Sequence, residues 1–251
     1  MSFSLKPLLA GLALLTVGGV AQAGELTVSA AASLTNAFKE IAQNYETLHA
    51  DAKVQLNFGA SGALLQQMAK GAPVDVFASA DQETMDQAAQ QKLIDPGSRQ
   101  NFANNALVLI VPNDSALQLA QLADLTQAGV EKVAIGNPAS VPVGRYSQQA
   151  LEKADLWSAV QAKAINTQNV RQSLDYVARG EVEAGFVYAT DASVMLDKVK
   201  VAFEVPLDET ISYPIAQTAD SANATEGQRF IAYVQSPAGQ AVLAKYGFKQ
   251  P

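Results

Sequence analysis

Apolar residues recur at helix and strand spacing along most of the chain. Those that follow residues 28–32 lie three or four positions apart, as on one helix face, and they are Leu34, Ala37, Phe38, Ile41, Ala42, Tyr45 and Leu48. Residues 54–58 alternate between apolar and polar side chains, which is typical of a strand. The first part of the chain is therefore predicted to run strand, helix, strand.

The same alternation continues to the C-terminus. Further strands are predicted at residues 74–78, 107–111, 133–136, 185–188, 199–203 and 213–216. Further helices are predicted at residues 64–69, 81–93, 145–154, 170–177, 225–235 and 238–246. Strands that alternate with helices predict an α/β protein with mainly parallel sheets flanked by helices.

Composition limits what such a protein could bind. Of the 251 residues, 49% are hydrophobic, which suffices for a packed core in one or two domains. The formal net charge is -7, and nucleic acid is not expected as a partner because phosphate contacts need clustered Lys and Arg. An anionic ligand would have to be held by local donors and not by a general positive field.

The N-terminus is predicted to be a signal peptide, residues 1–23. Lys6 is its only charge, residues 8–20 are apolar but too short to span a bilayer, and residues 21–23 form a small-x-small cleavage site. We expect cleavage after Ala23 and export of the mature chain to the periplasm. The chain has no Cys, which excludes a lipid-anchored Cys, disulfides and zinc–thiolate sites.

Several junctions place serines or backbone amides where a helix begins. Ser33 follows the first strand and is expected to cap the next helix, and Ser61 occupies the same position after the second strand. Val143 and Val170 also stand near predicted helix starts. The first N–H groups of a helix lack partners within it and attract anions. One such serine is explained by capping alone, but the repeated pattern favours an oxyanion site made of neutral donors.

Catalysis has weaker support in the sequence. His49 is the single histidine, and it stands at the end of the first helix, where a cation suits the helix dipole. A Ser-His-Asp triad would have to use it. Residues 59–63 approach the G-x-S-x-G nucleophile pattern but misplace the second glycine. A serine hydrolase therefore stays an alternative that lacks an evident base, and one histidine with scattered acids does not predict a transition-metal site.

Six segments resemble one known family in order along the chain. They are residues 31–37 (AASLTNA), 71–81 (GAPVDVFASAD), 141–144 (VPVG), 169–171 (NVR), 185–188 (GFVY) and 245–248 (KYGF). The family is that of the periplasmic molybdate-binding proteins of molybdate ABC transporters. The resemblance implies a type II periplasmic solute-binding fold with a ligand cleft between two domains. It places the first domain at residues 24–103 plus 213–251 and the second at residues 104–212, with crossings near Asn104 and Ser212.

The resemblance also implies a function and a ligand set. The cleft would close on molybdate or tungstate, and a monomeric receptor would deliver the ion to a membrane permease without any cofactor. The implied contacts to the molybdate oxygens are the hydroxyls and amides of Ser33 and Ser61, the amides of Val143 and Val170, and the phenol of Tyr188. The molybdenum itself would have no other protein contact. Receptors for sulfate, thiosulfate or ferric iron remain alternatives.

Two positions depart from the family pattern, and two arginines stand beside implied contacts. Val143 stands where relatives often have alanine, and Gly62 replaces a serine that is common after the second binding serine. Arg145 and Arg171 each follow an implied contact closely. The resemblance places neither arginine on the anion, and we interpret both as surface residues or as residues behind the ligand contacts.

Overall fold

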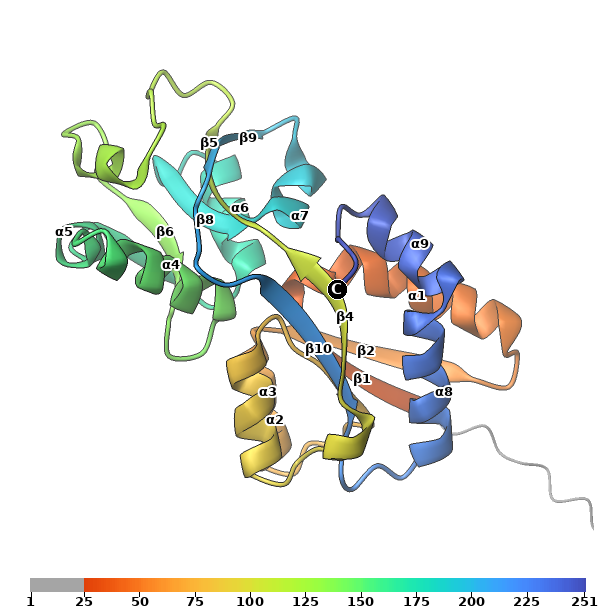
Figure 1. The fold of residues 1–251 in the computed structure, drawn as a ribbon. Helices are drawn as coiled ribbons and strands as arrows, with labels where there is room; N and C mark the ends of the chain where they lie inside the picture. Colours follow the sequence, from red (N-terminus) through yellow and green to blue (C-terminus); the bar gives the residue numbers. More distant parts are fainter. Residues whose placement is uncertain (1–24) are drawn as a thin grey trace, which may run out of the picture.

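The computed structural model describes residues 25–251 as two lobes, each built on a five-stranded sheet (Figure 1). The predicted signal peptide lies outside the described residues. Within residues 25–251, no helix combines the length and the apolar character needed to cross a membrane. The α/β class predicted from the alternating pattern is confirmed, since strands and helices alternate in both lobes.

The first lobe has a sheet flanked by five helices. In spatial order, its strands are β2 (Lys53–Gly59), β1 (Glu25–Ala31), β3 (Val76–Ala78), β10 (Ile211–Gln217) and β4 (Gln100–Asn105). Its helices are α1 (Thr35–Leu48), α2 (Ser61–Ala69), α3 (Gln82–Gln90), α8 (Ala224–Gln235) and α9 (Pro237–Lys245). Helices α2 and α3 pack together, and α1 contacts both α8 and α9, so the helices form two groups around the sheet.

The second lobe repeats this order with other strands. Its sheet runs β7 (Ala164–Thr167), β6 (Val133–Gly136), β8 (Ala184–Tyr188), β5 (Leu107–Pro112) and β9 (Val199–Glu204). Its helices are α4 (Pro142–Lys153), α5 (Trp157–Gln161), α6 (Val170–Ala178) and α7 (Ala189–Ala192). A 3-10 turn lies at Leu122–Thr126, between β5 and β6.

Both sheets are mixed, whereas the sequence pattern predicted mainly parallel sheets. β1 runs parallel to β2 and β3, but β10 runs antiparallel to β3 and β4. In the second lobe β6 pairs parallel with β7 and β8, and β5 pairs antiparallel with β8 and β9. The reversed strands β10 and β5 are those that begin where the chain has just come over from the other lobe, so each enters its sheet from the opposite end.

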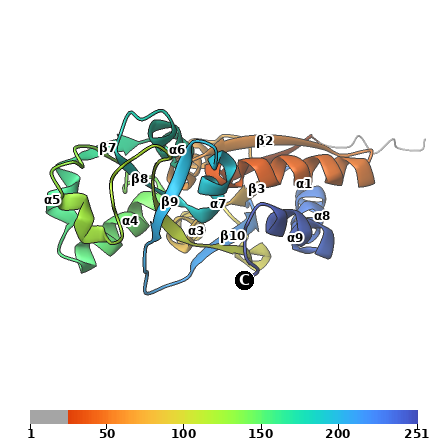
Figure 2. The same cartoon turned by 90° about the horizontal axis from the view of Figure 1, so that it is seen from above.

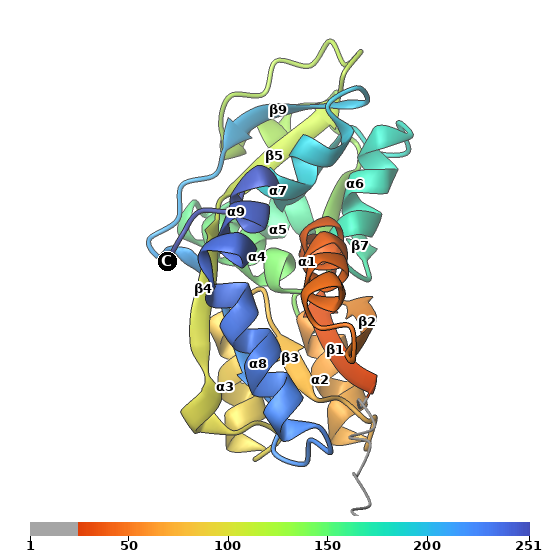
Figure 3. The same cartoon turned by 90° about the vertical axis from the view of Figure 1, so that its right-hand side faces the viewer.

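Two segments carry the chain between the lobes. β4 and β5 are separated by the single residue Ala106, and the chain returns between β9 and β10. Asn104 faces Ser212 in the β4–β10 register, and Asn104 and Lys249 also exchange two backbone hydrogen bonds of 2.7 and 3.0 Å. Figures 2 and 3 show the lobes on either side of these crossing strands. The domain bounds predicted from the sequence stay a prediction.

The lobes are packed against each other. Buried apolar residues of both sheets join in one cluster, and a smaller cluster lies between α2 and α3 and the first sheet. Tyr188 of β8 and Tyr213 of β10 meet edge to face, with ring centroids 5.8 Å apart. The contact between these two rings therefore joins the second lobe to a crossing strand of the first.

Candidate functional site

All five residues of the implied ligand set line one cavity between the lobes. Its complete lining is Ala31, Ala32, Ser33, Gly59, Ala60, Ser61, Ala80, Val141, Pro142, Val143, Asn169, Val170 and Tyr188. The space open to the centre of a water-sized sphere is about 10 Å³, roughly the room that one such sphere needs. A site of this size suits a small ion or molecule. That these five residues contact a ligand stays a prediction.

The lining carries no formal charge. Its polar side chains are two serines, an asparagine and a tyrosine, and no Asp, Glu, Lys, Arg or His belongs to it. Among the described residues there is also no group of three or more acids or histidines that could hold a bare metal ion. The cavity therefore offers neutral hydrogen-bond donors, which suit an oxyanion better than a cation.

Ser33 reaches the cavity from a tighter turn than the sequence predicted. Ala32–Leu34 form a 3-10 turn, α1 begins at Thr35, and Leu34 takes the cap position without a side-chain hydrogen bond. The expectation that Ser33 caps the helix is therefore wrong. Its buried hydroxyl lies 3.0 Å from the hydroxyl of Tyr213, a partner far away in the sequence.

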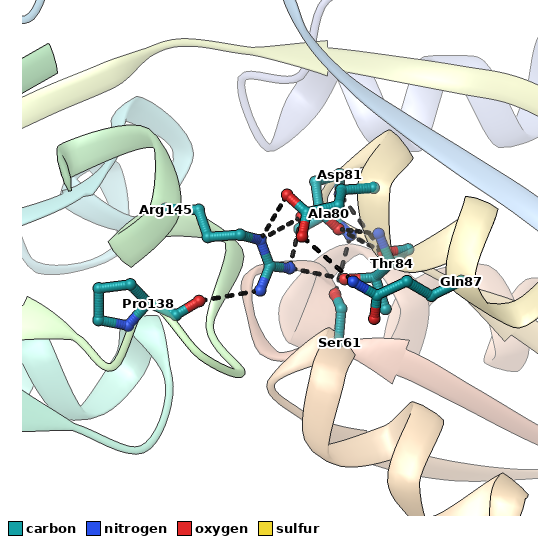
Figure 4. Close-up of polar contacts among 9 residues, drawn as sticks. Ser61, Ala80, Asp81, Thr84, Gln87, Pro138 and Arg145 are labelled. Atoms are coloured by element: carbon teal, nitrogen blue, oxygen red, sulfur yellow. Dashed lines mark hydrogen bonds and ion pairs between the residues drawn. The ribbon is translucent and has the colours of Figure 1, made fainter. Parts of the chain in front are cut away.

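Ser61 opens α2 as its first residue, and Ala60 takes the cap position. The backbone N–H of Ala80 donates to the Ser61 Oγ at 3.0 Å, and Ser61 is fully buried (Figure 4). A backbone N–H only donates, so the serine oxygen acts as its acceptor. The hydroxyl hydrogen of Ser61 is then left to point toward the cavity.

Val143 and Val170 lie in the first turns of α4 and α6, where backbone N–H groups have no partner within the helix. Both residues are buried and line the cavity. Gly144 allows this approach, because a Cβ there would lie 1.8 Å from the carbonyl oxygen of Gly136. The Val-Pro-x-Gly segment thus presses the start of α4 against the end of β6.

Tyr188 ends β8 and is 1% exposed. Its hydroxyl makes no hydrogen bond to any residue in the described part of the chain. Burial, with the nearby Tyr213, raises the pKa of Tyr188 well above its ordinary value, so the phenol stays protonated at neutral pH. A buried, protonated hydroxyl without a protein acceptor fits a ligand that accepts hydrogen bonds.

Arg145 does not line the cavity and instead ties the lobes together. From α4 it donates to Asp81 Oδ2 through Nε at 3.0 Å and Nη2 at 2.5 Å (Figure 4). Nη2 also donates to Thr84 Oγ1 at 2.6 Å, and both acceptors belong to the first lobe. Asp81 caps α3, accepting from the Thr84 N–H at 3.3 Å. The charge of Arg145 is therefore paired with a carboxylate.

Arg171 forms the second tie. Its Nε donates to the fully buried Asp191 at 2.5 Å, and its Nη1 donates across the lobes to Asn36 Oδ1 at 2.9 Å. Its Nη2 lies 3.3 Å from the Ser33 carbonyl oxygen. Burial raises the pKa of Asp191 to about 6, and the arginine charge opposes that rise. Neither arginine lines the cavity, which agrees with the interpretation that both lie behind the ligand contacts.

A backbone contact completes the closure. The Gly62 N–H in α2 donates to the Ser140 carbonyl oxygen of the second lobe at 3.0 Å. A Cβ on Gly62 would lie 2.7 Å from that oxygen and 2.8 Å from the Ser140 Cα. The departure from serine at this position thus has a physical reason, since glycine lets the two backbones meet.

The comparisons with known proteins bear on this geometry. A family model described as bacterial extracellular solute-binding protein matches residues 26–249. The chain belongs to this family. The family is one of solute-binding proteins. His49, the single histidine, lies outside the cavity lining and stacks on Tyr45, with ring centroids 4.6 Å apart.

Individual solute-binding proteins match over most of their length. The molybdate-binding protein ModA of Escherichia coli is 36% identical over 237 residues, covering 91% of this chain and 90% of that protein. YvgL of Bacillus subtilis, named as an ABC transporter substrate-binding lipoprotein, is 38% identical over 89% of this chain and 85% of its own. The solved periplasmic molybdate-binding protein of Azotobacter vinelandii superposes with a TM-score of 0.80 at 25% identity, covering 90% of this chain and all of that one.

Sequence reasoning missed Tyr213 and Asn105, which lie behind Ser33. Tyr213 is bonded to Ser33, and Asn105 Nδ2 donates to the Tyr213 hydroxyl at 3.1 Å. Both lie on crossing strands, and no local pattern marks them because their partners are far away in the sequence. The one available signal was the position of Tyr213 at the start of a predicted strand, residues 213–216.

Proposed function

We propose that the chain is the periplasmic receptor of an ABC transporter that binds molybdate, or tungstate, between its lobes. The relatives named above as molybdate-binding proteins support the ligand. The observation that carries the proposal is that Ser33, Ser61, Val143, Val170 and Tyr188 meet around one small, uncharged cavity. The ion is the cargo of the receptor and not a cofactor.

The donor set matches the chemistry of a deprotonated tetrahedral anion. Molybdate offers only acceptor oxygens near neutral pH, and amides and oriented hydroxyls supply only donors. A hydrogen bond to a charged group contributes about 1.5–3 kcal/mol. Several such bonds hold a dianion without a counter-charge, so Arg145 and Arg171 remain available to tie the lobes.

Two further parts of the proposal concern the whole chain. We propose that the two lobes are domains, residues 24–103 plus 213–251 and residues 104–212, that hinge about the two crossing segments. We also propose a monomer that is exported to the periplasm after cleavage behind Ala23 and that docks on a membrane permease, with no nucleic-acid partner. Mass spectrometry of the periplasmic protein tests the cleavage position.

Affinity for molybdate is expected to stay within about threefold between about pH 6.5 and 8.5. The range lies above the pKa of about 6 for Asp191, so that carboxylate is mostly ionised beside Arg171. It lies below the raised pKa values of Tyr188 and Tyr213, so both phenols stay protonated. Calorimetric titrations across the range measure this, and a tenfold change would mean that a titrating group lines the site.

Inorganic phosphate is expected to compete poorly with molybdate at pH 7. Phosphate retains a proton at that pH, and the cavity lining holds no carboxylate to accept it. Burying that proton unpaired costs about 1–3 kcal/mol. Competition titrations measure the ratio of the two affinities, and equal affinities would contradict the donor-only site.

Molybdate is also expected to close the lobes, because the proposed donors come from both. Small-angle scattering should give a smaller radius of gyration at saturating molybdate than without ligand. A ligand that binds only the folded chain also adds about 2.7 kcal/mol to the free energy of unfolding when its free concentration is a hundred times Kd, so the melting temperature rises. Scattering curves that coincide would contradict a large hinge motion.

The experiment that tests the proposed function is a calorimetric titration of the mature chain with four anions. We expect tight binding of molybdate and tungstate and little heat from sulfate or phosphate. Tight binding of sulfate with no binding of molybdate would replace the proposal by a sulfate receptor. No binding of any oxyanion would contradict the assignment of the cavity.

A further inference from the structure

A chain of hydrogen bonds with a fixed direction ends at Ser33. It starts at the backbone N–H of Ala106, the residue between the crossing strands β4 and β5, which donates to the Asn105 Oδ1 at 2.9 Å. Because a backbone N–H only donates, the atom that faces it must be the amide oxygen. This contact therefore fixes which end of the Asn105 amide carries the two N–H groups.

The Asn105 amide nitrogen then faces Tyr213 and Thr190. Nδ2 donates to the Thr190 Oγ1 at 2.8 Å and to the Tyr213 hydroxyl at 3.1 Å. The Tyr213 oxygen is thus an acceptor toward Asn105, and its own hydrogen needs another partner. Among the described residues its other hydrogen-bond partner is the Ser33 Oγ at 3.0 Å.

Tyr213 stays a donor at neutral pH. Its side chain is fully buried, and burial with the charge of Asp191 raises the pKa of Tyr213 well above its ordinary value. The phenol therefore keeps its hydrogen and donates it to Ser33. Because Tyr213 supplies the hydrogen of this bond, the Ser33 hydrogen is left free to donate into the cavity that Ser33 lines.

The two serines thus share one orientation, and different groups set it. At Ser61 a backbone amide, Ala80 N–H, occupies the hydroxyl oxygen. At Ser33 the same role falls to side chains, Tyr213 backed by Asn105. Each of the two hydroxyls accepts from a protein donor, so its own hydrogen is free to donate to a ligand.

We propose that Asn105 and Tyr213 are positioning residues that hold the Ser33 hydroxyl as a donor and so set the preference for fully deprotonated oxyanions over protonated ones. This inference rests on the proposed function. An anion that carries a hydrogen, such as hydrogen phosphate, needs an acceptor in the site. The hydrogen bond from Tyr213 occupies one of the two acceptor positions of the Ser33 oxygen, so fewer acceptors remain for that hydrogen.

Tyr213→Phe tests the proposal with little change of shape. The ring and its edge contacts to Phe102, Tyr188 and Phe248 stay, and only the hydroxyl is lost. We expect molybdate affinity to fall about threefold to tenfold. Affinity for hydrogen phosphate, measured by competition at pH 7, should stay the same or rise. The ratio of molybdate affinity to phosphate affinity should therefore fall.

A matched control is Tyr45→Phe. Tyr45 is also fully buried, and its hydroxyl donates to Glu226 in the first lobe, but it does not line the cavity. We expect this variant to lose stability and to keep the parent's ratio of molybdate to phosphate affinity. Melting temperatures of both variants without ligand separate an effect on stability from an effect on selectivity.

Asn105→Asp gives a second, independent arm. An ionised carboxylate only accepts, so Tyr213 must donate to it, and Ser33 loses its donor. We expect a loss of molybdate affinity at least as large as for Tyr213→Phe. The double variant Asn105→Asp/Tyr213→Phe separates this from simple charge repulsion, because it keeps the carboxylate but has no phenol to reverse. It should bind molybdate no worse than Tyr213→Phe alone.

Several results would overturn the inference. One is an unchanged ratio of affinities in a folded Tyr213→Phe chain, and another is an equal loss for both anions. If the double variant binds molybdate more weakly than Tyr213→Phe by the full factor that Asn105→Asp costs in the parent, that loss is due to charge repulsion. If Tyr213→Phe does not fold, the ratio of molybdate to phosphate affinity in Asn105→Asp is compared with the ratio in the parent, and an unchanged ratio overturns the inference. A parent chain that binds no molybdate contradicts the proposed function itself before any variant is compared.

Discussion

Replacing Ser61 by alanine is expected to weaken molybdate binding about tenfold to a hundredfold. The substitution removes a buried hydroxyl whose hydrogen is free to donate to the ligand. It also leaves the Ala80 N–H without its acceptor, so the ligand-free chain should lose about 1–3 kcal/mol of stability. Calorimetric titration well below the melting temperature measures the affinity separately.

Ser33→Ala is expected to have an effect of similar size, since it removes the other oriented hydroxyl. The control is Ser236→Ala, which removes a hydroxyl that caps α9 by accepting from the Gly239 N–H at 3.2 Å. That variant should lower the melting temperature and leave the affinity unchanged. Parent-like binding by both Ser33→Ala and Ser61→Ala would show that the site is misplaced.

Gly62→Ala is the second substitution with a large expected effect. A methyl group there would lie 2.7 Å from the Ser140 carbonyl oxygen, a backbone atom that cannot rotate away. The clash exists only when the lobes meet, so the closed form should lose about 1–3 kcal/mol, by analogy with overpacked cores. We expect about tenfold to a hundredfold weaker molybdate binding and a radius of gyration that falls less on adding molybdate.

Gly227→Ala is the matched control for this change. Gly227 lies inside α8, and a Cβ there would meet Val76 Cγ2 at 3.4 Å, an ordinary contact. Alanine in place of a helical glycine should raise the stability slightly and leave closure unchanged. If Gly62→Ala binds and closes like the parent, the contact between Gly62 and Ser140 does not define the closed form.

Strong local patterns predicted the elements that depend least on distant partners. The aliphatic run of β5 and the strand Val133–Gly136 are observed within a residue of the prediction. β4 was missed, because Gln100–Asn105 is mostly polar and forms a strand by pairing with β10 and, at Asn104, with Lys249. Tertiary pairing, and not propensity, makes that strand.

The site shows the same division. Helix starts marked Ser33, Ser61 and the Val143 and Val170 positions, because local backbone geometry produces such starts, and the family resemblance added Tyr188; all five are among the residues that line the cavity. The cap assigned to Ser33 was wrong, since the distant Tyr213 and not the helix engages its hydroxyl. The pairing of Arg145 with Asp81 joins two lobes and leaves no periodic signal in the sequence.

The most direct test of the account is a crystal structure of the mature chain grown with molybdate, in which anomalous scattering locates the molybdenum. The account predicts one molybdenum in the cavity, with oxygens within hydrogen-bond distance of the Ser33 and Ser61 hydroxyls, the Val143 and Val170 amides and the Tyr188 phenol. A molybdenum elsewhere, or oxygens bound by Arg145 or Arg171, would contradict it.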